Sequence, residues 1–238
     1  MSDFDIKNEE ENKHTQDETV DDSEKYEADI TEAFWNRQLG IMRASYINSA
    51  IIIMNIVIFI YSMIAGESFI NMFDHRSELI ILGSEMYRLI TSMFLHADLE
   101  HLFSNMLILF FVGANVEHDV GHIAYLFLYF LSGIIGNLSS MVYDYVSGDY
   151  IPSIGASGAV FGIIGAVAVI VLFGRNRIRK GSNLIFRLGL MIALSIYSGF
   201  TAGNIDNAAH IGGLLGGIVI TLLITVIGRK KYTMEEWL

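Results

Sequence analysis

The sequence has 238 residues, of which 53% are hydrophobic, and it contains one proline and no cysteine. This balance is typical of a protein that crosses a membrane several times rather than of one soluble core, and the lack of cysteine excludes disulfides, thiolate nucleophiles and thiolate metal ligands. The formal charge of −11 is concentrated at one end, because residues 1–35 carry a net charge of −10.

The N-terminal segment over 1–34 is polar, acidic and without apolar periodicity, so we expect it to be disordered. A solvated spacer is favoured over a partner-binding segment. An acidic start is not a cleavable signal peptide, which is basic and followed at once by an apolar run. We therefore expect an acidic cytoplasmic tail over 1–36, a membrane domain over 37–232 and a short cytoplasmic tail over 233–238. Aromatic and basic residues from Thr31 to Arg43 predict an interfacial lead-in.

Apolar runs then recur at lengths close to the roughly 20 residues that cross about 30 Å of hydrocarbon. The expected fold class is all-α, a polytopic bundle of six transmembrane helices. Lys and Arg cluster before the first span, after the fourth and after the sixth, which predicts that both termini are cytoplasmic. The expected spans are 44–65, 99–116, 122–143, 157–174, 184–202 and 207–228.

The connection over 67–98 has no spanning run. Its apolar residues predict short amphipathic turns at the membrane interface, formed by Phe69, Ile70, Met72 and Phe73.

Three of the expected spans carry polar side chains at equivalent ends. With six spans, the second, fourth and sixth all run from the outside to the inside. Their N-terminal ends hold His101 with Asn105, Ser157, and His210, respectively. Unpaired polar groups are costly in a membrane, and ionisable ones there suggest function, so we expect these side chains to converge near the outer leaflet.

The converging side chains suit acyl transfer. A serine hydroxyl needs a neighbouring base, and a neutral imidazole is the usual one, so Ser157 and His210 form a nucleophile and base pair. The developing oxyanion needs preorganised donors. His101 and Asn105 are four residues apart, hence on one helix face, and the amide of Ser157 lies in the first turn of its helix, where it has no intrahelical partner.

Small residues on the fourth and sixth spans predict close helix packing, through Gly158, Gly162, Gly213 and Gly217. Taken alone, this pattern indicates packing in lipid rather than catalysis. Phe161 lies one turn below Ser157, where its ring either stacks on His210 or packs in the core.

Two other features have weaker functional interpretations. Asp206 precedes His210 by four residues and could complete a triad, but a carboxylate at the end of a span is usually solvated. The His118-Asp119-Val120-Gly121-His122 segment resembles a zincin motif only superficially, because Asp replaces Glu and Gly121 breaks the helix. We expect an interfacial turn there and no metal site.

These residues resemble those of the rhomboid family of intramembrane serine proteases, over about residues 40–230. The segment Gly155-Ala156-Ser157-Gly158 is similar to the family motif GxSG, and Ala209-His210 with Gly213 and Gly217 is similar to AHxxGxxxG. His101 to Asn105 resembles the HxxxN segment that supplies oxyanion contacts.

The resemblance extends to several supporting positions. His96 and Glu117 resemble family positions, the latter a structural acid. Tyr87-Arg88 falls where Trp-Arg is usual, so the arginine is kept and the aromatic residue is changed. Phe161 replaces a Tyr of some members, and Ser92 stands where certain members have His.

The resemblance implies a membrane-embedded endopeptidase with a Ser-His dyad, no cofactor and a water-filled cavity open to the outside. It implies transmembrane protein substrates within the lipid bilayer and no nucleic-acid partner. The compact form favours a bacterial inner membrane, with the active site towards the outer leaflet. Two alternatives stay open at this stage: a catalytically inactive relative that binds membrane clients, and a channel or transporter with His101 and His210 as proton relays.

Overall fold

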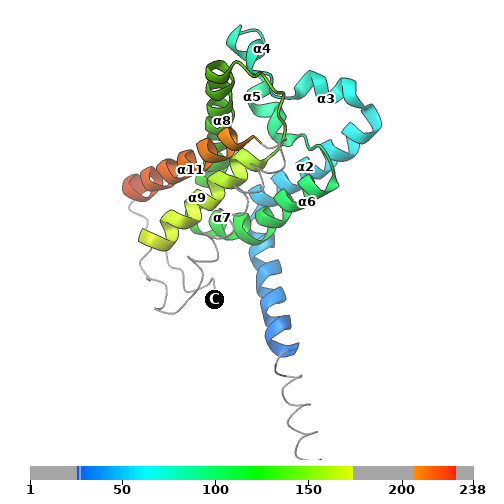
Figure 1. Cartoon of the computed structure of the whole chain (residues 1–238). Helices are drawn as coiled ribbons and strands as arrows, with labels where there is room; N and C mark the ends of the chain where they lie inside the picture. The colour runs from blue at the N-terminus through cyan, green and yellow to red at the C-terminus, as the bar shows by residue number, and fades with distance from the viewer. Residues whose placement is uncertain (1–25, 27, 174–205, 229–238) are drawn as a thin grey trace, which may run out of the picture. The chain divides into compact units, whose positions relative to one another are not determined.

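The structure is a computed structural model that describes residue 26, residues 28–173 and residues 206–228. The described elements are helices joined by short loops (Figure 1). They are α2 (Tyr46–Ala65), α3 (Glu67–Phe73), α4 (Ser77–Ile81), α5 (Arg88–Thr91), the 3₁₀ turn η1 (Ser92–Phe94), α6 (Leu99–Ile108), the π-helical turn η2 (Leu109–Gly113), α7 (Ala114–Val120), α8 (His122–Ser147), α9 (Ser157–Phe173) and α11 (Asn207–Gly228).

Four of the described helical stretches are long and apolar enough to cross a membrane: Tyr46–Ala65, Leu99–Val120, His122–Ser147 and Asn207–Thr225. A fifth apolar helix, Ser157–Leu172, is shorter. These five coincide with the first four and the last of the expected spans, and they make the chain a multi-pass membrane protein. The expected span over 184–202 lies outside the described residues, so the count of six stays a prediction.

Residues 28–44 form a helix, which overlaps only the last residues of the segment expected to be disordered over 1–34. The local sequence explains the helix: Ala28, Glu32 and Ala33 are strong helix formers, and Ile30 and Phe34 lie four residues apart on one helix face. The remaining tail residues, with the boundaries expected at 37 and 232, are not tested.

The connection over 67–98 contains helical turns, as its apolar pattern predicts. Helix α3 covers Phe69 to Phe73, and α4, α5 and η1 follow it. A short antiparallel bridge joins His75 to Ser153 in the loop before α9. The connection over 67–98 is therefore tied to the segment that leads to Ser157.

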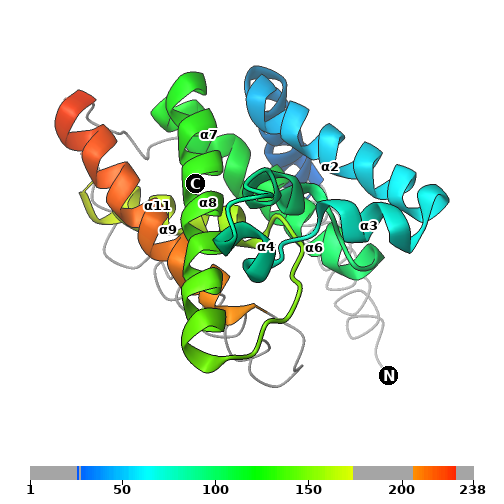
Figure 2. The ribbon, with the colours of Figure 1, turned by 90° about the horizontal axis from the view of Figure 1, so that it is seen from above.

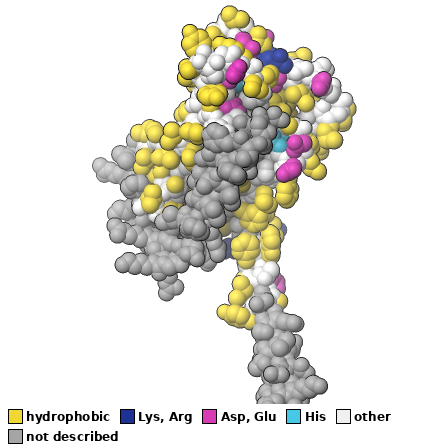
Figure 3. Space-filling model, viewed as in Figure 1, with side chains coloured by type: hydrophobic (Ala, Val, Ile, Leu, Met, Phe, Trp, Pro, Cys, Tyr) yellow, Lys and Arg dark blue, Asp and Glu magenta, His cyan; other side chains and the backbone are white. Residues whose placement is uncertain are grey.

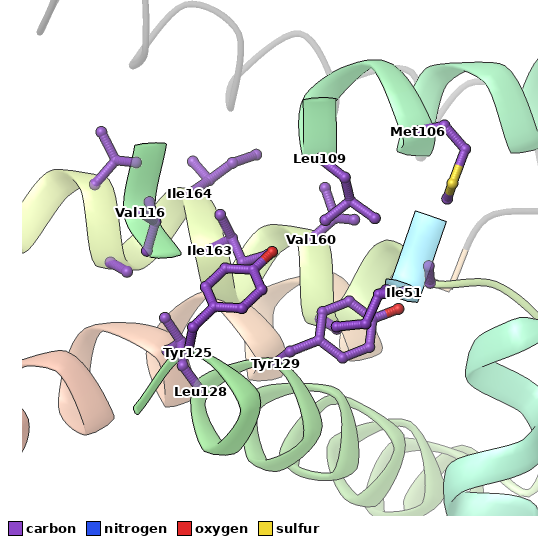
Figure 4. Close-up of a cluster of buried hydrophobic side chains, with 14 of the residues drawn as sticks. Ile51, Met106, Leu109, Val116, Tyr125, Leu128, Tyr129, Val160, Ile163 and Ile164 are labelled. Carbon is purple, nitrogen blue, oxygen red and sulfur yellow. The ribbon is translucent and has the colours of Figure 1, made fainter. Parts of the chain in front are cut away.

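Helix α9 lies inside the bundle, in contact with α8, α11, α6 and α7 (Figure 1, Figure 2). Every residue from Gly158 to Val167 is buried. A helix that is apolar on all sides needs such an environment, which explains why this short run has no polar face. Tyr125 and Tyr129 reach from α8 towards Val160 and Ile163 of α9 in the apolar core (Figure 4).

Hydrophobic side chains also cover much of the outer surface of the described helices. Figure 3 shows them on the parts of the visible face that are not grey, whereas charged side chains lie mainly in the upper part of the view. Helix α2 exposes Ile53, Val57 and Ile60, and α11 exposes Leu215 and Val219. Exposed apolar surface of this extent fits contact with lipid.

Candidate active site

Ser157 is the first residue of α9, and its side chain is half-buried. The chain reaches it through Gly155, whose φ of 137° favours glycine over residues with a side chain. A Cβ atom at Gly155 would lie 2.7 Å from Cε1 of His101 and 3.5 Å from Oγ of Ser157. The missing side chain therefore leaves room for the His101 ring beside the Ser157 hydroxyl.

His210 lies in the first turn of α11, where its backbone amide donates to the carbonyl oxygen of Asp206 at 3.1 Å. Its ring is buried and stacks on Phe161, with centroids 4.3 Å apart and planes 13° from parallel. Nδ1 of His210 has no hydrogen-bond partner among the described residues. Among the described residues, the stacking contact with Phe161 of α9 orients the imidazole of His210.

Glycines bring α9 and α11 together next to these two side chains. A Cβ atom at Gly213 would lie 2.0 Å from the carbonyl oxygen of Gly158, and one at Gly217 would lie 2.0 Å from that of Gly162. Both distances are far below van der Waals contact, so the backbones could not approach with a larger residue there. A Cβ atom at Gly158 would meet the carbonyl oxygen of Ala209 at 3.5 Å, an ordinary contact.

Gly162 is also confined by α8. A Cβ atom there would lie 2.2 Å from the side chain of Ser132 on α8. The four glycines expected at the packing positions therefore differ in the space around them. A side chain would clash at Gly162, Gly213 and Gly217, whereas Gly158 has room for one.

The two candidate oxyanion donors occupy the beginning of α6. Asp98 caps this helix by accepting from the amide of His101 at 2.7 Å. The amide nitrogen of Asn105 donates to the carbonyl oxygen of His101 at 2.8 Å. An amide group has two N–H bonds, so one hydrogen of Asn105 remains for another acceptor. The ring of His101 thus lies beside Gly155 in the loop that leads to Ser157, whereas the hydrogen bond of Asn105 is to a residue of its own helix.

Asp206 does not use its carboxylate on the His210 ring. Oδ1 accepts from the amide of Ala209 at 2.9 Å, and Oδ2 accepts from the hydroxyls of Ser140 and Ser153. The carboxylate is therefore occupied by three donors other than the imidazole, an arrangement that does not favour the triad interpretation.

The model of the rhomboid domain matches residues 83–226, which include Ser157 and His210. The chain belongs to the rhomboid family. The match lies inside the stretch over which the sequence motifs resemble that family.

Several known rhomboid proteins are similar to this chain. Rhomboid protease GluP of Bacillus subtilis is 38% identical over 147 residues, which cover 61% of this chain but 27% of that protein. Rhomboid protease AarA of Providencia stuartii is 31% identical over 209 residues, covering 76% of this chain and 73% of its own length. Rhomboid-like protease 3 of Toxoplasma gondii is 29% identical over 197 residues, with coverages of 79% and 71%.

In this rhomboid, His96 packs behind His101, with ring centroids 5.0 Å apart at 68°. The His96 ring is buried, and neither nitrogen has a hydrogen-bond partner among the described residues. Burial, with a smaller effect of nearby His101, lowers the pKa of His96 from 6.5 to about 3. His96 is therefore neutral at physiological pH and supports His101 by packing.

Arg88 organises the connection over 67–98 in this rhomboid. Its buried guanidinium forms a salt bridge with Asp74 at 2.6 Å and donates to the carbonyl oxygens of Asn71 and Asp74. Ser92, one turn later, accepts from the amide of Gly155 at 2.9 Å through its carbonyl oxygen. Arg88 thus fixes the short helix α5, and Ser92 directly after it binds the loop that leads to Ser157. Arg88 itself does not contact Ser157 or His210.

Glu117 stabilises the opposite end of the bundle. Its fully buried carboxylate accepts from the amides of Ile47 and Asn48 at the start of α2, and it bonds Nδ1 of His122. One histidine of the HDVGH segment, His122, is therefore used in a structural hydrogen bond to Glu117. Glu117 does not contact Ser157 or His210, and its carboxylate joins the beginning of α2 to the beginning of α8.

Sequence reasoning missed the buried polar groups that support the rhomboid core. Asn48 donates to the carbonyl oxygen of Leu109 at 2.9 Å, in the π-helical turn, and accepts from the Tyr125 hydroxyl at 2.6 Å. On α8, Ser140 and Asp144 bind Asp206 and Ser77, respectively. Polar residues inside expected spans, spaced at helical intervals, are the signal that could have identified them.

Proposed function

We propose that this rhomboid is an intramembrane serine endopeptidase, which hydrolyses peptide bonds in or next to transmembrane segments through Ser157 and His210. One observation carries the proposal. Phe161, one turn below Ser157 on α9, stacks on the ring of His210 with centroids 4.3 Å apart, which places the candidate base beside the helix that begins with Ser157. The names of GluP and AarA as proteases support the same class of chemistry.

The reaction assigned to the pair has two steps. In acylation, Oγ of Ser157 attacks the scissile carbonyl carbon while the imidazole of His210 takes its proton. The oxyanion is stabilised by the amide of Ser157 and by His101, with Asn105 as a further donor. The protonated imidazole then gives its proton to the leaving amine. In deacylation, water attacks the acyl carbon with His210 again as the base, and Ser157 is regenerated.

We infer the orientation from the positions of Lys and Arg in the sequence, and the substrate class from the site. Both termini are cytoplasmic, the dyad faces the outer leaflet, and the membrane is a bacterial inner membrane. A substrate helix must unwind for its carbonyl to reach Ser157, and unpaired amides are costly in hydrocarbon. Substrates should therefore carry Gly, Pro or β-branched residues near the outer end of the cleaved span.

A fluorophosphonate probe tests the proposal, because it labels only a serine activated by a base. Wild-type protein in detergent should be labelled at Ser157, whereas Ser157→Ala and His210→Ala should not be labelled. Ser49→Ala is the matched control, since Ser49 bonds backbone carbonyls near the inner end of α2. Failure of the folded wild type to react would favour the inactive client-binding alternative.

A further inference from the structure

Asp206 lies immediately before α11 and holds the beginning of that helix. Its Oδ1 accepts from the amide of Ala209 at 2.9 Å, and its carbonyl oxygen accepts from the amide of His210 at 3.1 Å. A side chain that caps a helix in this way fixes the direction of the first turn. The backbone position of His210 therefore depends on the carboxylate of Asp206.

The second oxygen of the same carboxylate holds the loop that leads to the nucleophile. Oδ2 accepts from the hydroxyl of Ser153 at 3.0 Å, and Ser153 is four residues before Ser157. The same oxygen accepts from the hydroxyl of Ser140 on α8 at 2.5 Å. One carboxylate thus joins the Ser157 loop, α8 and the first turn of α11.

The loop on the Ser153 side is fixed at two further points. The amide and carbonyl of Ser153 pair with His75, at 3.1 and 2.9 Å, and the amide of Gly155 donates to Ser92 at 2.9 Å. These bonds hold the loop to the connection over 67–98, and the carboxylate of Asp206 joins this fixed loop to the first turn of α11. Loss of the carboxylate should therefore let the first turn of α11, and with it His210, shift relative to Ser157.

We infer that Asp206 is a positioning residue that keeps Ser157 and His210 in register, rather than a triad acid that bonds the imidazole. The inference rests on the proposed function. Its carboxylate is occupied by Ala209, Ser140 and Ser153, and Nδ1 of His210 has no partner in the described part of the chain.

The decisive comparison is between Asp206→Asn and Asp206→Ala. Asn keeps an oxygen for the Ala209 amide, and the hydroxyls of Ser140 and Ser153 can turn to accept from its nitrogen. We expect Asp206→Asn to retain kcat within about threefold, and Asp206→Ala to lose roughly 10–100-fold in kcat with little change in KM, as for a reacting group that is misplaced. A triad acid would instead lose about 10⁴-fold in kcat on conversion to Asn.

Ser153→Ala tests the loop half of the contact without changing the helix cap. It should lower kcat, and this loss should disappear in an Asp206→Ala background, because the partner is already gone. The matched control is Ser45→Ala, which removes another buried hydroxyl bond, to the carbonyl oxygen of Ala114, away from the dyad. Ser45→Ala should lower thermal stability and leave kcat unchanged below its melting temperature.

The outcomes separate the inference from the proposed function. Loss of turnover in Asp206→Asn as deep as in Asp206→Ala would overturn the positioning role, and so would full activity of Asp206→Ala. Should Asp206→Ala not fold, a kcat of Ser153→Ala equal to that of the Ser45→Ala control would overturn it as well. A folded wild type without turnover would refute the protease proposal. The melting temperatures of Ser153→Ala, Asp206→Ala and the double variant would still measure the contact between Ser153 and Asp206.

Discussion

The imidazole of His210 lies flat on the ring of Phe161, with centroids 4.3 Å apart and planes 13° from parallel. The two rings come from neighbouring helices, α11 and α9, so their contact ties the orientation of the candidate base to the helix that begins with Ser157. The spacing in the sequence left stacking open beside ordinary core packing, and the structure has the stacked arrangement.

Removing the Phe161 ring should therefore impair catalysis. Aromatic pairs contribute about 1 kcal/mol beyond their buried area, so Phe161→Ala should lower kcat by roughly fivefold or more as His210 loses its orientation. Phe161→Tyr keeps the ring and should remain close to wild type. Steady-state kinetics below the melting temperature of both variants measure the difference. Unchanged kcat in Phe161→Ala would show that the stacking does not orient the base.

The contact between α9 and α11 predicts unequal effects of adding one methyl group. Gly213→Ala places a Cβ atom 2.0 Å from the carbonyl oxygen of Gly158, whereas Gly158→Ala places one 3.5 Å from its nearest neighbour. Overpacking typically costs about 1–3 kcal/mol, so Gly213→Ala should lower the free energy of unfolding by at least this amount. Gly158→Ala is the matched control and should change it far less. Equal melting temperatures for the two variants would be inconsistent with this helix contact.

The buried His96 predicts lower stability in acid. Its pKa is about 3 in the folded protein and 6.5 when exposed, so between these values the unfolded chain binds a proton that the folded chain does not. The free energy of unfolding should therefore fall as the pH drops below about 6.5, by up to about 1.4 kcal/mol per pH unit. Burial lowers the pKa of His75 too, and that residue adds to the slope in the same direction.

Unfolding measured at pH 7.5, 6 and 5 in one detergent tests this dependence. His96→Gln should reduce the slope of stability against pH, whereas His118→Gln, which changes a largely exposed side chain, should retain it. A slope in His96→Gln equal to that of the wild type would assign the pH dependence to other groups.

The carboxylate of Glu117 predicts a structural effect at the beginning of α2. Glu117→Gln removes a charge that accepts from two backbone amides and pairs with His122. Hydrogen bonds to charged groups contribute about 1.5–3 kcal/mol each, so the variant should lose at least that much stability. Glu100→Gln, at an exposed position of α6, is the matched control. If both variants melted together, the Glu117 contacts would be shown not to stabilise the bundle.

Local patterns in the sequence were sufficient for most helices. Apolar runs gave the approximate limits of α2, α8, α9 and α11, because lipid-facing and buried helix surfaces are both apolar. The helix at residues 28–44 was missed, since the acidic composition of the whole N-terminal segment outweighed the helix-forming residues at its end. The π-helical turn has no local signature, because the carbonyl oxygen of Leu109 is satisfied by Asn48, 61 residues away in sequence.

In the candidate site, too, the residues could be predicted from the sequence but their supporting contacts could not. Ser157, His210 and His101 could be identified from residue type and from their place at the ends of spans. The contacts that hold them could not, because they join distant segments: Asp206 to Ser153 across 53 residues, and Asp206 to Ser140 across 66. Which oxygen of a carboxylate meets which hydroxyl is decided by tertiary packing and leaves no periodic pattern in the sequence.

Cleavage of a transmembrane substrate in proteoliposomes tests the central claim most directly. Purified wild type, Ser157→Ala and His210→Ala are compared on a span with a Gly-Pro pair in its outer half, with the protein amount and folded fraction matched. The dyad acts as a unit, so each variant alone should lose essentially all turnover, and cleavage by the wild type should fall within the outer half of the span. Measurable turnover by Ser157→Ala would contradict the assignment of Ser157 as the nucleophile.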